Sequence, residues 1–183
     1  MKFERSSGIL LHISSLPNTD GIGDLGPEAF HFVDFLEKTN TKLWQILPLN
    51  PTGYGNSPYQ GLSAFAGNPL FINLHTLVKD GLLSENDLKR KPSFPKNKVD
   101  FSRAIIWKTH ALDLVFNNFI ENPPKSICKA FLDFRKNNQY WLEDFSTFMT
   151  ARIKYNLFSW SKWPKSLRFR EEKAVSNFKH KYS

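Results

Sequence analysis

Two short, continuous apolar runs lie near the start of the chain, at residues 8–13 (GILLHI) and 43–49 (LWQILPL). Runs of this length that lack a polar alternation are typical of strands buried on both faces. Serine pairs flank the first run, and Pro48 and Pro51 stop the second. The pattern therefore predicts two buried β-strands.

A helical pattern separates the two predicted strands. Pro27 suits the first residue of a helix, and Glu28 is favourable beside the positive end of the helix dipole. The expected apolar stripe of about three turns consists of Ala29, Phe30, Val33 and Leu36. Strand, helix and strand within about 40 residues form a βαβ unit, so the two strands should be parallel.

Residues 50–70 (NPTGYGNSPYQGLSAFAGNPL) follow the second predicted strand and break both periodicities. Four glycines and three prolines exclude a regular helix or strand across this stretch. Its aromatic residues and apolar flanks argue against disorder, so an ordered binding loop is expected. The loop would leave the carboxyl end of a parallel strand, where α/β proteins build their active sites.

The remaining residues have mostly helical patterns. Ser84 and Asp100 are expected N-caps, and Pro123-Pro124 is an expected break. The expected helical segments are short pieces between 73 and 88, then 100–121, a helix that carries Ile127 to Phe134, another that carries Trp141 to Ile153, and a last one at 165–179. Residues 1–72 thus resemble the opening of a larger α/β structure, and residues 73–183 resemble a helical insertion.

Composition narrows the class of protein. The chain has 183 residues, the length of one ordinary domain, and 15% of them are aromatic. It contains no apolar run of about 18 residues that could span a membrane, and the N-terminus lacks a signal-peptide pattern. The single cysteine, Cys128, is expected to be an inert thiol in a reducing compartment, which favours a cytoplasmic location.

Charge is distributed unevenly along the chain. Residues 1–88 hold five Lys and Arg against nine Asp and Glu, whereas residues 89–183 hold twenty against eight. A basic half can indicate a nucleic-acid surface. Here the basic residues alternate with apolar ones at helical spacing, which favours solvated helix faces, and no nucleic-acid partner is expected.

The residue types of the 50–70 loop suit a sugar. Tyrosine rings offer flat apolar faces to a pyranose, while Asn, Ser and Gln supply neutral hydrogen-bonding groups. On the residues alone, the alternative that Tyr54 and Tyr59 are packing residues stays open. The five histidines show no metal-ligand spacing, so no metal site is expected.

Four literal motifs add to this picture: RSSGILLHISSLP from Arg5, GIGDLG from Gly21, WQILPLNPTGYGNSPY from Trp44 and SAFAGNPL from Ser63. In this order they closely resemble the amylomaltases, the 4-α-glucanotransferases or disproportionating enzymes of glycoside hydrolase family 77. The segments VDFSRAIIWK, NQYWLEDFSTFM and FSWSKWP are more loosely similar to the family's helical insertion. The resemblance covers most of this chain but only the N-terminal third or so of a family member.

The resemblance implies a (β/α)8 barrel that transfers an α-1,4-glucan segment to the 4-OH of glucose or another glucan, without a cofactor. The implied chemistry is retaining, through a nucleophile and an acid/base carboxyl about 5–5.5 Å apart. In the family both lie at later barrel strands, so no catalytic residue is expected in this chain. Asp24 and the pair Glu143-Asp144 match no catalytic motif and are interpreted as structural and as solvated, respectively.

Matched residue by residue, Tyr59 and Ser57 correspond to contacts in the donor subsites, and Asn68 belongs to the motif that shapes the same wall. Tyr54 matches a residue linked to a second glucan groove. Trp44 and His12 are interpreted as core residues rather than ligand contacts or catalysts. The expected partners are therefore α-1,4-glucans and maltooligosaccharides.

The length of the chain leaves alternatives open. A barrel needs about 250 residues, so 183 are expected to form an incomplete one and to be inactive alone. A non-catalytic glucan-binding fragment, or a degenerate remnant, is the second hypothesis, and a basic nucleic-acid module is the third. The sequence leaves open whether Ser183 is a natural end, and it leaves the oligomeric state open too.

Overall fold

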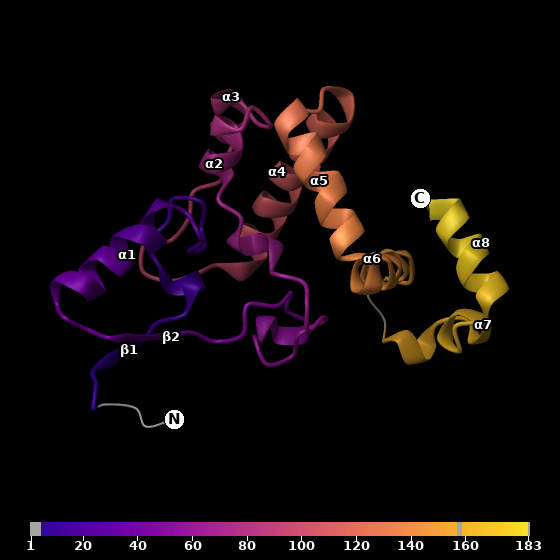
Figure 1. Cartoon of the computed structure of the whole chain (residues 1–183), viewed down its shortest axis with the longest axis horizontal. Helices are drawn as coiled ribbons and strands as arrows, with labels where there is room; N and C mark the ends of the chain where they lie inside the picture. The colour runs from indigo at the N-terminus through magenta and orange to yellow at the C-terminus, as the bar shows by residue number, and fades with distance from the viewer. Residues whose placement is uncertain (1–4, 157–158, 183) are drawn as a thin grey trace. The chain divides into compact units, whose positions relative to one another are not determined.

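The computed structural model describes residues 5–156 and 159–182. The chain forms two compact units, Met1–Cys128 and Lys129–Ser183, which are taken here one at a time. Both are shown in Figure 1. The described residues make an α/β structure, mostly helical, with one small parallel sheet.

The first unit opens with the predicted βαβ unit. Strand β1 (Gly8–Leu10) pairs in parallel with β2 (Leu43–Gln45), with Ile9 opposite Trp44, and α1 (Pro27–Lys38) lies between them in sequence. Figure 1 shows the two strands side by side below α1. Each strand has three residues, fewer than predicted, because a 3-10 turn, η1 (Ile13–Ser15), follows β1 and the prolines follow β2.

The prediction that both strands are buried on both faces is wrong for this structure. Leu10 is 60% exposed and Leu43 is 53% exposed. Each strand has a single partner, so the outer edge and much of each face meet no second layer among the described residues. On α1, Ala29 and Leu36 are buried as expected, but Phe30 and Val33 point outward.

The inward line of α1 is completed by Phe32 rather than by Phe30 and Val33. The rings of Phe32 and Trp44 meet edge to face, with centroids 4.8 Å apart. Ala29, Phe32 and Leu36 are spaced at i, i+3 and i+7, which is one side of a helix. The predicted stripe was therefore displaced around the helix, since it included Phe30 and Val33 and left out Phe32.

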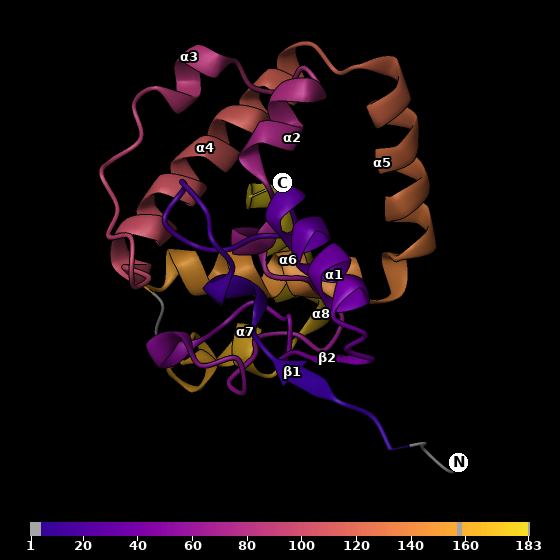
Figure 2. The same cartoon turned by 90° about the vertical axis from the view of Figure 1, so that its left-hand side faces the viewer.

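Three further helices complete the first unit: α2 (Leu74–Lys79), α3 (Glu85–Leu88) and α4 (Phe101–Glu121). Each has a side-chain N-cap, and two of the three, Ser84 and Asp100, were predicted from sequence. Figure 2 shows α2 lying along α4. Trp107 and Ala111 of α4 pack with Leu74, Leu83 and Leu88.

The predicted domain boundary at residues 72 and 73 differs from the division into compact units at residues 128 and 129. Ala104 of α4 is completely buried in one cluster with Ile13, Ile22 and Phe71, which come from the βαβ unit and its loops. Helix α4 therefore contributes to the core of the N-terminal segment. The assignment of residues 73–183 to a barrel insertion stays a prediction.

The second unit holds most of α5 (Lys125–Asn137), then α6 (Gln139–Lys154), the 3-10 turn η4 (Trp160–Lys162), α7 (Lys165–Arg168) and α8 (Glu172–Tyr182). The predicted helices over 127–134 and 141–153 are confirmed. Phe131, Leu132 and Phe134 of α5 are nevertheless exposed. The predicted interruption at 158–164 is observed from residue 159 on, and Phe158 lies outside the described residues.

The single helix predicted at 165–179 is wrong, because the chain turns at Arg170. This residue has φ +57°, and the N–H groups of Arg170 and Glu171 donate to the carbonyls of Leu167 and Ser166. The two bonds form a Schellman motif, which ends a helix and usually places glycine at the left-handed position. An arginine there gives no sequence signal for a stop. Among the described helices, none is long and apolar enough to cross a membrane.

Candidate glucan-binding loop

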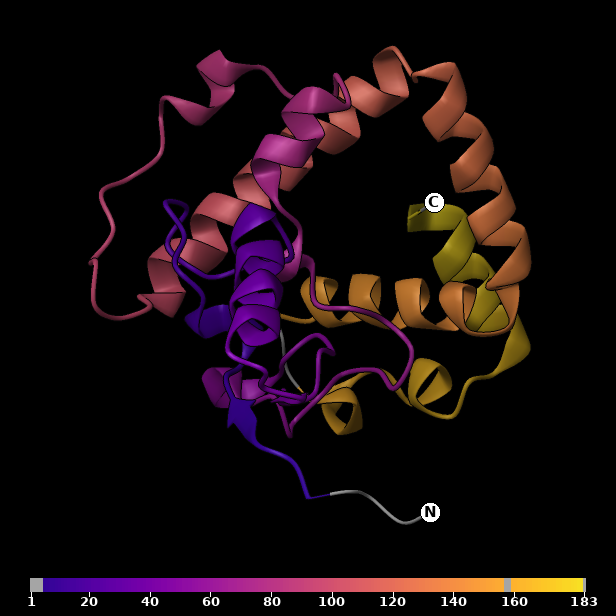
Figure 3. The ribbon, with the colours of Figure 1, turned by 60° about the vertical axis from the view of Figure 1, so that its left-hand side comes forward.

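The 50–70 loop is folded on itself just past the carboxyl end of β2, as Figure 3 shows. Thr52 and Gly61 form an isolated antiparallel bridge. The N–H of Gly53 donates to the Gln60 carbonyl and the N–H of Leu62 donates to the Pro51 carbonyl, each at 2.8 Å. These bonds close a tight excursion over residues 53–60, so the loop is ordered, as predicted.

The excursion presents its aromatic residues to the outside. Tyr54 opens a 3-10 turn, η2 (Tyr54–Asn56), and is 89% exposed, while Tyr59 is 74% exposed. Ser57 is half-buried beside them, and its carbonyl accepts a hydrogen bond from the Gln60 N–H at 3.1 Å. Neither tyrosine belongs to the core of the described structure, so both rings can be contacted by a ligand.

Asn68 occupies a different position from the tyrosines. Its side chain is buried, and its Oδ1 accepts the N–H of Leu70 at 3.0 Å, which caps the 3-10 turn η3 (Pro69–Phe71). Its own N–H donates to the Leu49 carbonyl at 2.8 Å. Asn68 therefore joins the two ends of the loop. This geometry suits the shaping of a wall, and direct contact with a ligand stays a prediction.

The two core interpretations from sequence fit their surroundings. Trp44 packs on Phe32 and its Nε1 donates to the Leu11 carbonyl at 2.7 Å. His12 follows β1, meets the Phe71 ring edge to face at 5.4 Å, and accepts the Leu47 N–H at Nδ1, at 3.3 Å. Burial lowers the pKa of His12 below its ordinary value of 6.5 because the charged imidazolium loses hydration.

The buried acidic residues are Asp20 and Asp24, within the ranges that the structure describes. Asp24 accepts hydrogen bonds at Oδ1 from Asn73 Nδ2 at 2.9 Å and from the Gly26 N–H at 3.1 Å. Its Oδ2 faces Lys108 Nζ at 2.9 Å. These contacts give Asp24 a structural role, which is how the sequence was interpreted. The exposed pair Glu143 and Asp144 instead forms surface ion pairs with Lys179 and Arg170.

Asp20 has a different environment from Asp24. Its carboxylate is 3.7 Å from His75 Nε2 and 3.8 Å from Lys91 Nζ, and neither oxygen accepts a hydrogen bond from a described residue. The Lys91 ammonium lies at the limit of an ion pair, so it acts on the Asp20 carboxylate through space rather than by a hydrogen bond.

Lys108 is the residue that sequence reasoning missed. It is completely buried, and its Nζ also donates to the Ile72 carbonyl at 2.6 Å. One signal was available, because Lys108 stands one turn after Ala104 and beside Trp107 on the apolar stripe of α4. A lysine at such a position is stable only with a buried acceptor.

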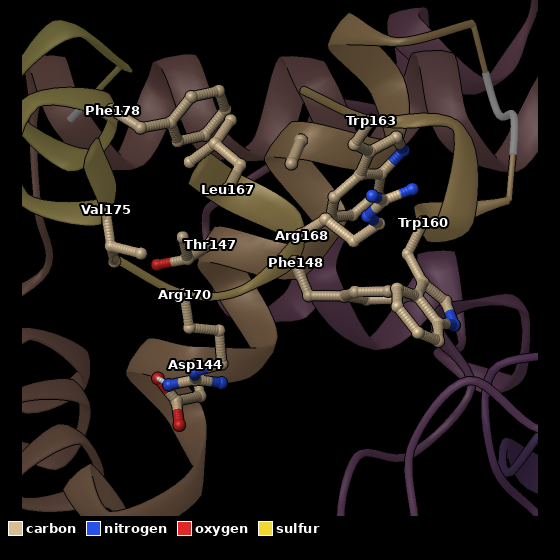
Figure 4. Close-up of a pocket in the computed structure, with 11 residues that line it drawn as sticks. Asp144, Thr147, Phe148, Trp160, Trp163, Leu167, Arg168, Arg170, Val175 and Phe178 are labelled. Atoms are coloured by element: carbon tan, nitrogen blue, oxygen red, sulfur yellow. Dashed lines mark hydrogen bonds and ion pairs between the residues drawn. The ribbon is translucent and has the colours of Figure 1, made fainter. Parts of the chain in front are cut away.

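A pocket lies within the Lys129–Ser183 unit, between α6, η4, α7 and α8. Figure 4 shows its lining, with Phe148, Trp160 and Trp163 on one side and the Asp144–Arg170 ion pair on another. Its volume is about 290 Å³. Asp144 is the one carboxylate in this lining and Arg170 neutralises it at 2.8 Å, so this pocket holds no pair of acids for glycosyl transfer.

The fold and the loop together define an α/β protein whose candidate ligand loop leaves the carboxyl end of a parallel strand. Comparison with known proteins then gives the family. The sequence pattern of the 4-alpha-glucanotransferases matches residues 11–183. This chain belongs to the 4-alpha-glucanotransferase family.

Individual relatives agree with this assignment. A 4-alpha-glucanotransferase of Thermus thermophilus is 43% identical over 179 residues, which are 98% of this chain and 35% of the relative. One from a Synechocystis species is 42% identical over 172 residues, which are 94% and 34%. The chain thus spans about a third of the length of the curated relatives that it matches.

The solved structures show the same relationship. An amylomaltase from Streptococcus agalactiae in complex with acarbose matches with a TM-score of 0.88 and 36% identity. The match covers 97% of this chain and 36% of that structure. The family resemblance inferred from the four sequence motifs is therefore confirmed.

Proposed function

We propose that this chain is the N-terminal, substrate-contacting part of a 4-α-glucanotransferase. The whole enzyme would transfer an α-1,4-glucan segment to the 4-OH of glucose or another glucan by a retaining double displacement. The observation that carries the proposal is the family membership combined with an ordered loop whose tyrosines are free of the core. The two carboxylates of the reaction would lie in the part of a family member that this chain does not span.

The loop geometry indicates how such a part would act on a glucan. Tyr54 and Tyr59 offer flat apolar surfaces with a hydroxyl at the far end, which is the chemistry that binds a pyranose ring. Ser57 adds a neutral hydrogen-bonding group beside Tyr59, and Asn68 fixes the base of the loop. The partners proposed are therefore α-1,4-glucans and maltooligosaccharides, and the proposed location is cytoplasmic, in keeping with the free thiol of Cys128.

The fold proposed for the whole protein is a (β/α)8 barrel, of which the observed βαβ unit would be the opening. The exposed apolar residues Leu10 and Leu43 support this, because neighbouring β/α units would cover them. A glucan-binding fragment without turnover is the second candidate function, and the exposed, ordered loop supports it equally.

The test measures glucan binding by this chain with maltoheptaose as the probe, in an NMR titration. Saturable shifts at loop amides are expected, and Tyr59→Ala should weaken binding about fivefold or more through the loss of ring contact. The matched control is Tyr140→Ala, which removes an equally exposed tyrosine from the second unit and should leave the affinity unchanged. Absence of saturable binding would contradict the proposal.

A second measurement separates transferase from binding fragment. This chain alone is expected to leave maltotriose unchanged. Heat-sensitive release of glucose together with longer oligosaccharides would show that this chain carries catalytic groups itself. That result would overturn the proposal that both carboxylates lie in the part of a family member that this chain does not span.

A further inference from the structure

The base of the candidate glucan loop is attached to helix α4 by a buried cation, in addition to the packing of Ala104 with Phe71. Lys108 Nζ donates to the Ile72 carbonyl at 2.6 Å, and Ile72 directly follows η3. No part of the Lys108 side chain is exposed. The contact therefore links α4 to the residue that directly follows η3 and the buried Phe71.

The loop depends on η3 at its downstream end. The N–H of Phe71 donates to the Asn68 carbonyl at 3.0 Å, and Asn68 in turn bonds to the Leu49 carbonyl at 2.8 Å. The Phe71 carbonyl accepts the N–H of Leu25 at 3.0 Å. A displacement of Ile72 would thus pass through Phe71 to Asn68, the residue that joins the two ends of the loop.

Asp24 orients the Lys108 side chain. Its Oδ2 lies 2.9 Å from Nζ, while its Oδ1 accepts from Asn73 Nδ2, so one carboxylate contacts both α4 and the residue that follows Ile72. A buried ammonium needs such a partner, and charge-assisted hydrogen bonds are the strong ones in a dry interior. The carboxylate, the lysine and the Ile72 carbonyl form one connected network.

The shape of the turn that carries Asp24 also serves this network. A side chain at Gly26 would collide with the Asn73 amide and come within 2.8 Å of Asp24 Oδ1. The glycine therefore lets the turn approach residue 73 closely enough for the hydrogen bond to form.

From these contacts we infer that Lys108 and Asp24 are positioning residues for glucan binding, which hold the base of the 50–70 loop in its binding conformation. The inference rests on the proposed function of the loop. Neither residue touches the ligand, because both are buried. Their effect reaches Tyr59 and Ser57 through Ile72, η3 and Asn68.

The test uses amide hydrogen exchange of the 183-residue chain, followed by NMR. The main variant is the double change Asp24→Asn with Lys108→Met, which removes the ion pair and leaves no uncompensated charge. We expect the amides of Asn68, Phe71 and Ile72 to exchange about tenfold faster or more, while amides of α1 change less than twofold. Equal acceleration in α1 and in the loop, or no acceleration in the loop, would overturn the proposal.

Arg103→Met is the matched control, because it removes an exposed cation from the same helix. Arg103 Nε lies 3.3 Å from Asp100 Oδ2. This variant should leave loop exchange unchanged. If the double variant does not fold, amide hydrogen exchange of the native protein in low urea tests the proposal instead. The Phe71 and Ala111 amides should then open together, with the same dependence on urea, and separate openings would overturn the proposal.

A binding measurement separates this inference from the proposed function. Maltoheptaose should bind the double variant about fivefold or more weakly than the native chain, and Arg103→Met should bind like the native chain. Faster loop exchange with unchanged affinity would overturn the positioning role. Failure of the native chain to bind would contradict the proposed function, while the exchange data would still decide whether Lys108 anchors the loop.

Discussion

Lys108 Nζ lies 2.9 Å from Asp24 Oδ2, although the two residues are 84 positions apart in sequence. The ammonium is fully buried and the carboxylate is 2% exposed. Desolvation of two charges is costly, and hydrogen bonds offset part of that cost: Lys108 Nζ donates to the Ile72 carbonyl, and Asn73 Nδ2 and the Gly26 N–H donate to Asp24 Oδ1. The pair fixes α4 against the glycine-rich turn.

Loss of one partner of this pair should destabilise the protein strongly. Lys108→Met leaves Asp24 buried without its cation, and the free energy of unfolding should fall by about 3–5 kcal/mol. The double variant Asp24→Asn with Lys108→Met should lose less than the single one, because no charge stays unpaired. Urea denaturation of both variants measures the difference, and a single variant as stable as the native chain would contradict this reading.

Gly26→Ala should destabilise the first unit through a steric clash. The added methyl group meets the Asn73 amide and would displace it from Asp24. We expect a loss of about 1–3 kcal/mol in the free energy of unfolding. Gly67→Ala is the control, because the added methyl group there has no neighbour within 4 Å and the change should stay within about 0.5 kcal/mol. Thermal melts of both variants provide the comparison.

His12 should make stability depend on pH. Its pKa in the folded state lies below the ordinary value of 6.5, so the unfolded chain binds more protons in this range. Stability contributed by neutral His12 is therefore complete above pH 6.5 and falls as the pH drops from 6.5 through the folded pKa. Urea denaturation at a series of pH values should show this decline.

The variant His12→Gln keeps a hydrogen-bond acceptor for the Leu47 N–H but cannot gain a proton. It should flatten the decline below pH 6.5. His31→Gln, at an exposed histidine beside Glu28, should retain the decline. An unchanged profile in the His12 variant would assign the pH dependence to other groups.

Ser84→Ala should loosen the first turn of α3. Ser84 and Asp87 form a capping box in which the Ser84 Oγ donates to Asp87 Oδ2 at 2.7 Å and the Asp87 N–H donates back to Oγ. The hydroxyl and the Ser84 N–H lower the pKa of Asp87 below its ordinary range. The variant should raise that pKa and cost about 1 kcal/mol of stability. An NMR titration of Asp87 reports the first effect, and an unmoved pKa would contradict the assignment.

Local features of the fold could be predicted from the sequence because they depend on neighbouring residues. Pro27 begins α1, Ser84 and Asp100 cap α3 and α4, and two apolar runs around a helix give a parallel βαβ unit. The spacing of glycine, proline and aromatic residues in the 50–70 loop predicted an ordered excursion, and the structure shows one. Two of the four motifs that identified the family, those starting at Trp44 and Ser63, reach into the same segment.

Other features were decided only by contacts between distant residues. Three examples depend on which face of a helix meets which turn. Lys108 is buried, Phe30 is exposed while Phe32 packs inward on α1, and Ala104 packs into the N-terminal core. The stop at Arg170 depends on a left-handed backbone that arginine does not signal. The sequence by itself determined most of the elements, the order of the loop and the family, since these depend on short-range patterns. Tertiary structure decided how the loop is held, since a buried ion pair forms only after the chain has brought residues 24 and 108 together.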